Sequence, residues 1–341
     1  MDFTTGGRLE VRITPDDVRK RVSVRLLTGD RSGPERFTDV VGVLTSWTEG
    51  VLHITRRTGE SVRIEESSLV AGKVVPAAPA RRRGPAATAH ELDRVAARGW
   101  PPTTSERLGE WELRASGGFT RRANSVLPLG DPGHGLDEAL RRVTGWYAER
   151  GLPAYIQVST GAEGTQEPLA AELEKRGWTR EVSAQVRIAA LAPIADQDAD
   201  VSAVTLSRRI DDAWLARYQR SARPTPEALA VLSGGPSVWF ATIRGEPGEA
   251  AEEAPAAIGR CVVDGRWAGF AAVETAPERR RQGLARAVMT ALARQALDEG
   301  ASAAYLQVET DNSGAHALYD GLGFALHHSY HHWRAPSTDN A

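Results

Sequence analysis

An arginine-rich turn between Pro277 and Ala285 carries the residue types and spacing best suited to bind an anion. The segment reads PERRRQGLA, and apolar residues at helical spacing begin at Leu284. The first backbone N–H groups of a helix have no partner inside the helix and carry the positive end of its dipole. A pyrophosphate accepts several such groups at once, and charge-assisted contacts can come from Arg280, Arg281 and Arg286.

Small residues keep the backbone of this turn open. Side chains larger than those of Gly283 and Ala285 would hold phosphates away from the N–H groups. Taken alone, the pattern Arg-x-x-Gly-x-Ala also describes a surface arginine cluster before an ordinary helix. Its place between a predicted strand, Trp267–Glu274, and a predicted helix, Leu284–Glu299, which stops at Gly300, favours the anion site.

A second group of residues further along the chain supports the anion site and specifies its ligand. It consists of Gln307-Val308-Glu309, Asn312, Ala315, Leu318-Tyr319 and Gly323-Phe324. With both groups present, residues 202–335 resemble the GNAT superfamily of acetyltransferases. Arg280-x-x-Gly283-x-Ala285 is similar to that family's acetyl-CoA signature, and Asn312-x-x-Ala315-x-x-Leu318-Tyr319-x-x-x-Gly323-Phe324 is similar to its C-terminal signature.

The resemblance implies a mixed α/β sheet in which two strands, here Trp267–Glu274 and Ala303–Glu309, splay apart. The pantetheine arm of acetyl-CoA lies in that gap much as an added strand would. Main-chain contacts then come from Val273 and Thr275, and Asn312 bonds to the arm. The implied acetyl-CoA site comprises Val273, Thr275, Arg280, Arg281, Gln282, Gly283, Leu284, Ala285, Arg286, Asn312 and Ala315.

The same resemblance implies catalytic roles. The family transfers acetyl directly from a thioester to an amine, with Tyr319 as the general acid. A phenol of pKa ~10 can donate its proton to a departing thiolate of pKa ~8.5, although a tyrosine here also suits the core. Glu274 and Glu309 end the two splayed strands, and each is a candidate general base acting through water or a solvated strand end.

Neither cysteine nor metal chemistry is indicated. The single cysteine, Cys261, lies in a predicted strand and suits a buried position. In the last predicted strand, alternation places His327 with His331 on one face and His328 with His332 on the other. Two pairs without a nearby carboxylate or thiolate predict no metal site, and we expect one of these histidines to border the acceptor.

An internal repeat relates two parts of the chain. Ala154–Val158 reads AYIQV and Ala304–Val308 reads AYLQV. Each lies between a helical pattern and a short helix with an aromatic end and a closing strand. Residues 86–192 and 202–335 are therefore predicted to be two tandem copies of one α/β unit.

The first copy is predicted to be degenerate. It has Gly133 and Gly135 where the anion turn should fall, but no Arg-x-x-Gly-x-Ala, and Glu172-Leu173-Glu174 stands in place of Leu-Tyr. We expect this half to shape the acceptor cleft rather than to form a second active site. Its segment Gly117–Pro128 gives no indication of whether Arg121, Arg122 and Asn124 bind a ligand.

Residues 1–75 are predicted to form a small all-β barrel. Turns separate five short strands, Val22–Leu27, Thr38–Thr45, Val51–Thr55, Ser61–Ile64 and Leu69–Val75. The barrel resembles the SH3-like domain that precedes a tandem GNAT region in an actinobacterial, histone-acetyltransferase-like family. Contact with protein or nucleic acid and a packing role are both open to it. Residues 76–85, rich in Pro and Arg, form a predicted linker.

The composition excludes several classes of protein. The 341 residues are 41% hydrophobic and 25% charged, and the formal net charge of -2 gives no global signature of nucleic-acid binding. We find no apolar run that would span a membrane and no secretory signal, and one cysteine fits a reducing compartment. A cytoplasmic protein is expected, with Arg244–Pro255 as a solvated hairpin loop.

The sequence thus predicts an acyltransferase that moves acetyl from acetyl-CoA, its co-substrate, to a primary amine without a metal. The acceptor is a protein lysine, as in a histone-like protein, or a small-molecule amine. The tandem layout resembles mycothiol synthase, and an aminoglycoside-type acceptor is a further alternative. A non-catalytic acetyl-CoA sensor is the competing class. Catalysis is expected in the C-terminal half, without membrane contact.

Overall fold

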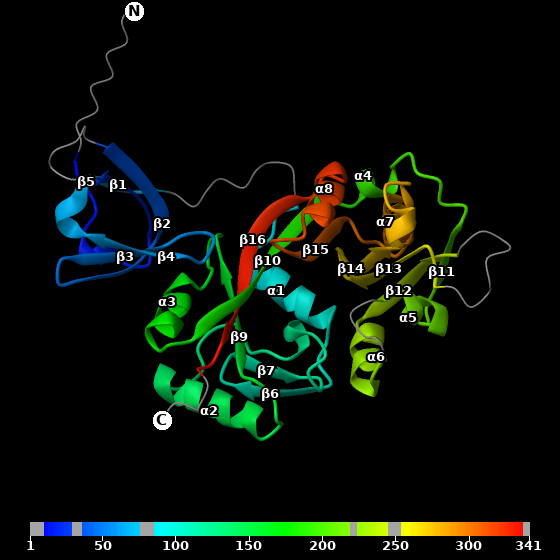
Figure 1. Ribbon diagram of the computed structural model, residues 1–341, viewed down its shortest axis with the longest axis horizontal. Helices are drawn as coiled ribbons and strands as arrows, with labels where there is room; N and C mark the ends of the chain where they lie inside the picture. Colours follow the sequence, from blue (N-terminus) through cyan, green and yellow to red (C-terminus); the bar gives the residue numbers. More distant parts are fainter. Residues whose placement is uncertain (1–9, 29–35, 76–84, 219–223, 245–253, 337–341) are drawn as a thin grey trace, which may run out of the picture.

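The computed structural model describes residues 10–28, 36–75, 85–218, 224–244 and 254–336. An N-terminal all-β part lies beside a larger α/β body (Figure 1). Residues 76–84 of the predicted linker and 245–253 of the predicted hairpin loop lie outside the described residues. Within the described ranges, no helix combines the length and the apolarity needed to cross a membrane.

The N-terminal part is one antiparallel sheet with the strand order β4-β3-β2-β1-β5. Its strands confirm the five predicted ones: β1 (Arg21–Thr28), β2 (Arg36–Thr48), β3 (Val51–Thr55), β4 (Ser61–Glu65) and β5 (Leu69–Val74). Alternation along β1 buries Val22, Val24 and Leu26 in the core of this part. Since β4 and β5 are the edges and no pairing between them is found among the described residues, the SH3-like barrel stays a prediction.

The first half of the body begins with a helix and a small sheet. These are α1 (Ala89–Arg98), β6 (Thr104–Leu108), β7 (Trp111–Ala115) and β8 (Leu127–Pro128). The half continues with α2 (Leu136–Ala148), β9 (Tyr155–Thr160), α3 (Glu167–Lys175) and β10 (Thr179–Ala190). The elements from α2 to β10 confirm the helices and strands predicted around the first copy of the repeat, whereas α1 and β6–β8 had no sequence prediction.

The second half confirms the predicted strands Trp267–Glu274 and Ala303–Glu309 and the predicted helix Leu284–Glu299. After α4 (Ala192–Ala195) come β11 (Val204–Ser207), α5 (Asp212–Arg217), α6 (Pro226–Ser233), β12 (Ser237–Ile243), β13 (Ala257–Asp264) and β14 (Trp267–Thr275). The chain ends with α7 (Leu284–Asp298), β15 (Ala303–Glu309), α8 (Ser313–Gly321) and β16 (Ala325–Arg334). Gly300, at φ 90°, follows α7 as its C-terminal signal predicts.

The two halves exchange their closing strands within one eight-stranded sheet. Its order is β11-β12-β13-β14-β15-β10-β16-β9. Strand β10 of the first half pairs with β15 and β16 of the second, and β16 pairs in turn with β9 of the first. The boundaries 86–192 and 202–335 stay a prediction, but the two copies share a sheet instead of each completing its own.

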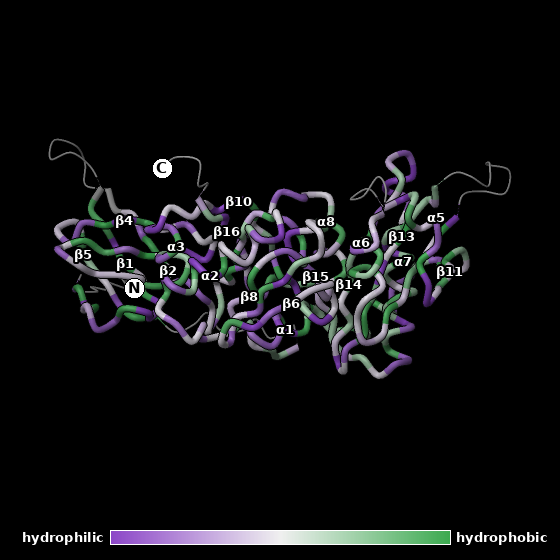
Figure 2. The backbone as a smooth tube through the Cα atoms, turned by 90° about the horizontal axis from the view of Figure 1, so that it is seen from below, coloured by the Kyte–Doolittle hydropathy of each residue, from purple (hydrophilic) through white to green (hydrophobic). Residues whose placement is uncertain are grey.

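Helices from both halves cover this sheet. Helix α7 packs against β12, β13 and β14, and its buried Val288, Leu292 and Ala296 belong to the largest core. Helix α1 places Leu92 and Val95 against the central strands β10, β15 and β16. The molecule is elongated, with β1–β5 near one end and β11, α5 and α7 near the other (Figure 2).

The histidines of β16 do not all alternate as predicted. Pairing with β10 skips His327, which has no partner between Leu326 and His328. This bulge places the Nδ1 atoms of His327 and His328 2.8 Å apart, so the expected shared face of His327 and His331 is wrong. No group of three or more His, Cys, Asp or Glu side chains in the described part of the chain is arranged to hold a metal ion.

Candidate functional site

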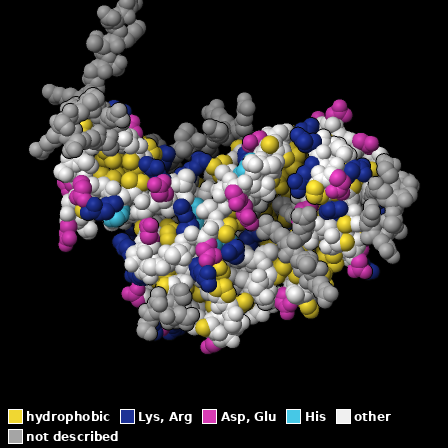
Figure 3. Space-filling view, in the orientation of Figure 1, with side chains coloured by type: hydrophobic (Ala, Val, Ile, Leu, Met, Phe, Trp, Pro, Cys, Tyr) yellow, Lys and Arg dark blue, Asp and Glu magenta, His cyan; other side chains and the backbone are white. Residues whose placement is uncertain are grey.

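One cavity of about 1410 Å³ brings together every residue that the sequence predicted for acetyl-CoA binding or catalysis. It extends from the arginine-rich turn, along the parts of β14 and β15 that no longer pair, to residues of the first half. On the outer surface, basic side chains gather over α7 and α8 (Figure 3). The predicted residues that line the cavity are Val273, Glu274, Thr275, Arg280, Arg281, Gln282, Gly283, Leu284, Ala285, Arg286, Glu309, Asn312, Ala315 and Tyr319.

The predicted splay of the two strands is present. Parallel pairing of β14 with β15 runs from Trp267 opposite Ala303 to Phe270 opposite Leu306. Beyond that point β14 continues to Thr275 and β15 to Glu309, and no pairing between them is found in the described residues. A gap therefore opens between the two strands and into the cavity, and the edge of β14 that faces this gap has no strand partner among the described residues.

A bulge in β14 accompanies the splay. The register of β14 against β13 shifts near Ala272, a non-glycine residue held at φ 51°. An extra residue in one strand bends it and increases its local twist. Across from the bulge, a Cβ on Gly259 would lie 2.4 Å from Val288 Cγ1, so only glycine lets α7 pack this close. The bulge and the helix together direct the end of β14 away from β15.

The arginine-rich turn leaves the beginning of α7 without a side-chain cap. Gly283 is the N-cap residue at φ 82°, and Arg281 is also left-handed at φ 61°. A Cβ on Gly283 would meet no atom within 4 Å, so the protein needs glycine there for its backbone conformation, and the adjoining space is open. The uncapped N–H groups of a 15-residue helix thus face a cavity that Arg280 and Arg281 also line.

Helix α8 and its N-cap carry four residues of the second predicted group: Asn312, Ala315, Leu318 and Tyr319. The Oδ1 atom of Asn312 accepts a hydrogen bond from the Ala315 backbone N–H at 3.1 Å and caps the helix. The ring of Tyr319 lies edge-on to that of Phe324, with 5.8 Å between centroids. Burial raises the pKa of Tyr319 to about 12, and its hydroxyl has no hydrogen-bond partner among the described residues.

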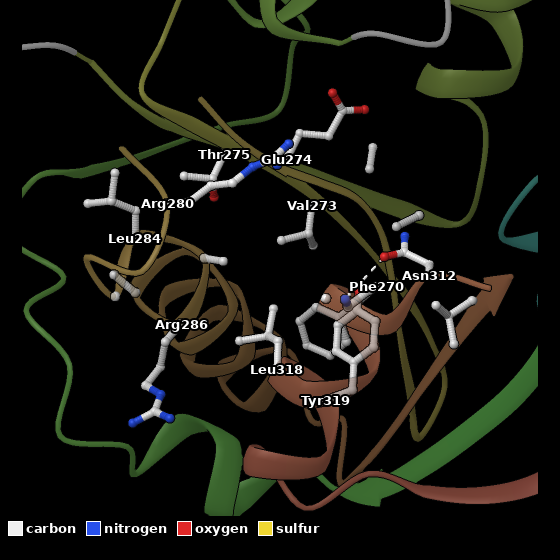
Figure 4. Close-up of a pocket in the computed structure, with 18 of the residues that line it drawn as sticks. Phe270, Val273, Glu274, Thr275, Arg280, Leu284, Arg286, Asn312, Leu318 and Tyr319 are labelled. Carbon is white, nitrogen blue, oxygen red and sulfur yellow. Dashed lines mark hydrogen bonds between the residues drawn. The ribbon is translucent and has the colours of Figure 1, made fainter. Parts of the chain in front are cut away.

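The two candidate bases are partly buried at the strand ends. Val273 and Leu318 point into the space between β14, α7 and α8, beside the rings of Tyr319 and Phe270, while the Glu274 side chain extends from the opposite side of β14 (Figure 4). Glu309 lies opposite Ala184 of the exchanged strand β10. The two carboxylates thus approach the cavity from different strands.

A contact across the two halves holds α8 in place. Arg187 of β10 pairs with Asp320 next to Tyr319, donates to the carbonyl oxygen of Phe324 at 3.0 Å, and lies 3.0 Å from Nδ1 of His316. The Nε2 atom of His316 donates to the Glu309 carbonyl oxygen at 3.1 Å. A strand of the first half therefore fixes the helix that carries the candidate acid.

Several residues that line the cavity were not assigned to the site from the sequence, and four of them bear on the acceptor. Trp100 and Arg122 come from the first half, Tyr218 follows α5, and Tyr330 lies on β16. Single aromatic or basic residues in segments without a motif give no signal of a shared cavity. None of the four histidines considered for the acceptor lines it.

Other sequence predictions can be placed in the structure. Cys261 is fully buried in β13, and burial raises the pKa of its thiol to about 12, which leaves it unsuited to nucleophilic attack. Gly133 and Gly135 of the first half do not line the cavity. Asn124 is buried and bonds to the backbone of Ser116, Gly118, Phe119 and Thr120, so it holds its loop together.

Comparisons with known proteins bear on this cavity. Residues 86–333 match the family described as "Probable histone acetyltransferase Rv0428c C-terminal". A Mycobacterium tuberculosis protein named "Probable histone acetyltransferase Rv0428c" is 29% identical over 324 residues, 93% of this chain and 95% of the relative. The "Uncharacterized N-acetyltransferase YobR" of Bacillus subtilis is 28% identical over 253 residues, 72% of this chain and 97% of the relative.

A solved structure shares the fold. A "GCN5-related N-acetyltransferase from Kribbella flavida" superposes with a TM-score of 0.54 at 15% identity, over 75% of this chain and 98% of that one.

Proposed function

Because this chain belongs to the Rv0428c C-terminal family of GNAT N-acetyltransferases, we propose that its cavity binds acetyl-CoA and that the acetyl group passes directly to a primary amine. The observation that carries the proposal is the gap between β14 and β15, which opens beyond Phe270 beside the uncapped beginning of α7. Catalysis belongs to residues 202–335 in this proposal, and residues 86–192 shape the acceptor side.

The turn suits a pyrophosphate. Oxygens of a pyrophosphate can accept from the first N–H groups of α7, whose dipole favours negative charge there. The open space at Gly283 and the exposed guanidinium groups of Arg280 and Arg281 support this role. Val273, Thr275 and Asn312 would bind the pantetheine arm, because the unpaired backbone of β14 offers it hydrogen bonds like those of a neighbouring strand.

Bound acetyl-CoA would supply an activated thioester carbonyl, and the residues of the chain would move the protons. A bond forms between the amine nitrogen and the carbonyl carbon while the carbon–sulfur bond breaks. Tyr319 donates its phenolic proton to the departing sulfur, and its raised pKa keeps that proton in place beforehand. The amine proton passes through water to Glu274 or Glu309.

A comparison of two variants can decide whether Glu274 or Glu309 is the general base. Glu274→Gln and Glu309→Gln each remove a carboxylate with little change in volume. The variant of the true base should lower kcat about 100-fold or more, and its loss should be greatest near neutral pH, where the amine carries a proton. Equal, small effects from both variants would mean that water alone takes the proton.

The acceptor and the N-terminal sheet complete the proposal. The name of the Mycobacterium relative makes a lysine of a histone-like protein one candidate acceptor, and a small-molecule amine is the other. The N-terminal sheet, proposed to be SH3-like, would contact protein or nucleic acid. The cytoplasmic location predicted from the sequence belongs to the same proposal.

The test is thiol release from acetyl-CoA by the full chain. The assay uses a panel of small amines and basic proteins as acceptors. Acceptor-dependent release, abolished in Tyr319→Phe, is expected. Tight acetyl-CoA binding without release in the presence of any acceptor would favour the sensor instead. Salt-dependent binding of DNA to the full chain, lost when residues 1–85 are removed, would support a nucleic-acid role for the sheet.

A further inference from the structure

The acceptor end of the cavity is built by both halves of the chain. Besides residues of β14, β15 and the arginine-rich turn, the lining includes Trp100 and Arg122 from the first half, together with Tyr218 and Tyr330. Glu274 and Glu309 line the same cavity on the strand ends. The space in which an amine would approach therefore has carboxylates on one part of its wall and a guanidinium among aromatic rings on another.

The position of Arg122 is fixed by its surroundings. It lies in a short 3-10 turn, Arg121–Ala123, whose loop is held by four hydrogen bonds of the buried Asn124 side chain. The guanidinium carbon lies 4.4 Å from the centre of a Trp100 ring, and Nη1 donates to Oε1 of Gln307 at 2.7 Å. Stacking on tryptophan and one hydrogen bond orient the group without neutralising it.

The neighbouring Arg121 differs from Arg122 in having a carboxylate partner. Arg121 forms an ion pair with Glu181 at 3.0 Å and does not line the cavity. Arg122 is only partly exposed, yet among the described residues no carboxylate lies within ion-pair distance of it. Since a desolvated cation without a counter-ion is costly, the arrangement favours an anion from outside the protein.

A second guanidinium adds to the positive charge at this place. Arg260 is fully buried, lies 5.0 Å from the Trp100 ring, and donates to the carbonyl oxygens of Leu232, Gly99 and Gly234. Burial lowers the pKa of Arg260 to about 10, and the charge of Arg122 acts in the same direction. Two cations thus share one indole ring with only neutral partners, and a cavity with open volume adjoins one of them.

We propose that Arg122 is a subsite for a carboxylate, and that the acceptor is a small molecule carrying both a primary amine and a carboxylate, as an amino acid does. Glu274 and Glu309 then attract the ammonium end, and Arg122 binds the carboxylate, in bidentate geometry through the donors that Gln307 leaves available. Trp100, Tyr218 and Tyr330 provide apolar surface for the rest of the acceptor. A lysine within a protein chain carries no such carboxylate. This inference rests on the proposed transfer of acetyl to an amine.

The test compares amines that differ only by a carboxylate. Thiol release from acetyl-CoA is measured with phenylalanine and 2-phenylethylamine, lysine and cadaverine, and leucine and isoamylamine. For the full chain, we expect the carboxylated member of at least one pair to be preferred roughly 10- to 100-fold in kcat/KM, the size of a charge-assisted bidentate contact. Arg122→Gln should abolish the preference by raising KM for the carboxylated amine alone.

Matched variants separate recognition from structure. Arg121→Gln, which changes the neighbouring guanidinium outside the cavity, should keep the preference. Arg122→Lys should recover part of it, since lysine restores the charge but not the bidentate geometry. Equal rates for both members of every pair in the full chain would overturn the proposal. An equal loss for both members in Arg122→Gln would do the same, because it would assign Arg122 to holding Gln307.

A binding measurement covers the case in which no amine on the panel is acetylated. N-acetylphenylalanine and N-(2-phenylethyl)acetamide are titrated calorimetrically into the full chain with coenzyme A. Tighter binding of the carboxylated compound, lost in Arg122→Gln, supports the subsite even if the proposed transfer fails. Equal affinity for the two compounds, or binding of neither, counts against the subsite. In the thiol-release assay, activity with basic proteins alone would support the proposed transfer but overturn the proposed small-molecule acceptor.

Discussion

At the scale of single residues, removal of the Tyr319 hydroxyl distinguishes a catalytic role of this residue from a packing role. Tyr319→Phe keeps the ring against Phe324, with its 5.8 Å centroid separation, and removes only the proton donor. We expect kcat to fall about 100- to 10,000-fold while KM for acetyl-CoA changes little, because general acid catalysis contributes about that much. Steady-state thiol release at saturating acetyl-CoA measures both constants.

A second tyrosine serves as the control for this change. Tyr155 donates its hydroxyl to Glu181 and does not line the cavity, so Tyr155→Phe should keep kcat. Unchanged turnover in Tyr319→Phe would show instead that its ring alone matters, as part of the core around Phe324.

The pH dependence of the reaction should carry the signature of Tyr319. Burial raises its pKa to about 12, so the protonated, donating form persists through neutral and moderately alkaline pH. The rate should therefore rise as the base and the amine lose their protons. It should not fall through ionisation of Tyr319 until the pH approaches 12. A descending limb with an apparent pKa near ~8 to 9 in stable protein would contradict this assignment.

At the scale of elements, the two ends of α7 form a matched pair. Gly283 before the helix and Gly300 after it have φ of 82° and 90°, and a Cβ on either would meet no atom within 4 Å. Alanine at either site should lower stability by about 1 to 2 kcal/mol through left-handed backbone strain. Only Gly283→Ala should weaken acetyl-CoA binding, because only its methyl group enters the proposed pyrophosphate site.

Calorimetric titration of acetyl-CoA and thermal unfolding of both variants measure these effects. Gly283→Glu should abolish binding, since a carboxylate would repel the phosphates. Equal acetyl-CoA affinity in Gly283→Ala and Gly300→Ala would place the pyrophosphate elsewhere.

The same elements show what the sequence could predict about the site. Gly283, Asn312 and Tyr319 could be assigned because short-range rules govern a strand–turn–helix and its cap, and the resemblance extends over both signatures. Trp100 and Arg122 could not, because they approach the cavity through long-range packing of the first half. The displaced His327 follows from a bulge, a local insertion that regular alternation along a strand cannot reveal.

At the scale of the whole molecule, the N-terminal sheet is joined to the body around His331. The β3–β4 turn meets this histidine closely: a Cβ on Gly59 would lie 2.7 Å from its Nε2 atom. The hydroxyl of Thr160 donates to the Arg57 carbonyl, so it accepts from Nε2–H of His331, and Nδ1 accepts from the Ser183 hydroxyl. Because Nδ1 accepts a hydrogen bond, it carries no proton, and the His331 ring at this junction is neutral.

This junction should weaken in acid. Burial, helped by the charge of Arg180, lowers the pKa of His331 to about 4 from its ordinary value of 6.5. Since the folded pKa is depressed, the unfolded chain takes up the proton first, and the contribution to stability is complete above pH 6.5. About 3 kcal/mol should be lost as the pH falls from 6.5 towards 4, and the buried His332 acts in the same sense.

Urea unfolding of the full chain between pH 7.5 and 4.5 measures the loss. His331→Gln should make the slope of unfolding free energy against pH shallower by up to about 1.4 kcal/mol per unit. His134→Gln, at an exposed histidine, should keep the wild-type slope. An unaltered slope in His331→Gln would mean that folding does not lower the pKa of this ring.

The exchange of closing strands predicts that neither half of the body is stable alone. The internal repeat indicated two related units, and each predicted closing strand exists. Pairing partners could not be predicted because a local pattern identifies a strand but not the distant strand with which it pairs. Without β10, a fragment of residues 200–336 would leave β15 with an unpaired edge and β16 without both neighbours. Exposed apolar strand edges of this kind aggregate.

We therefore expect residues 85–336 to give folded, acetyl-CoA-binding protein and residues 200–336 to be insoluble. Co-expression of residues 85–199 with 200–336 should restore a soluble complex, since each fragment supplies the strand that the other lacks. Solubility, circular dichroism and acetyl-CoA titration distinguish these cases. A monomeric 200–336 fragment that binds acetyl-CoA as tightly as the full chain would show that the shared sheet is dispensable for the site.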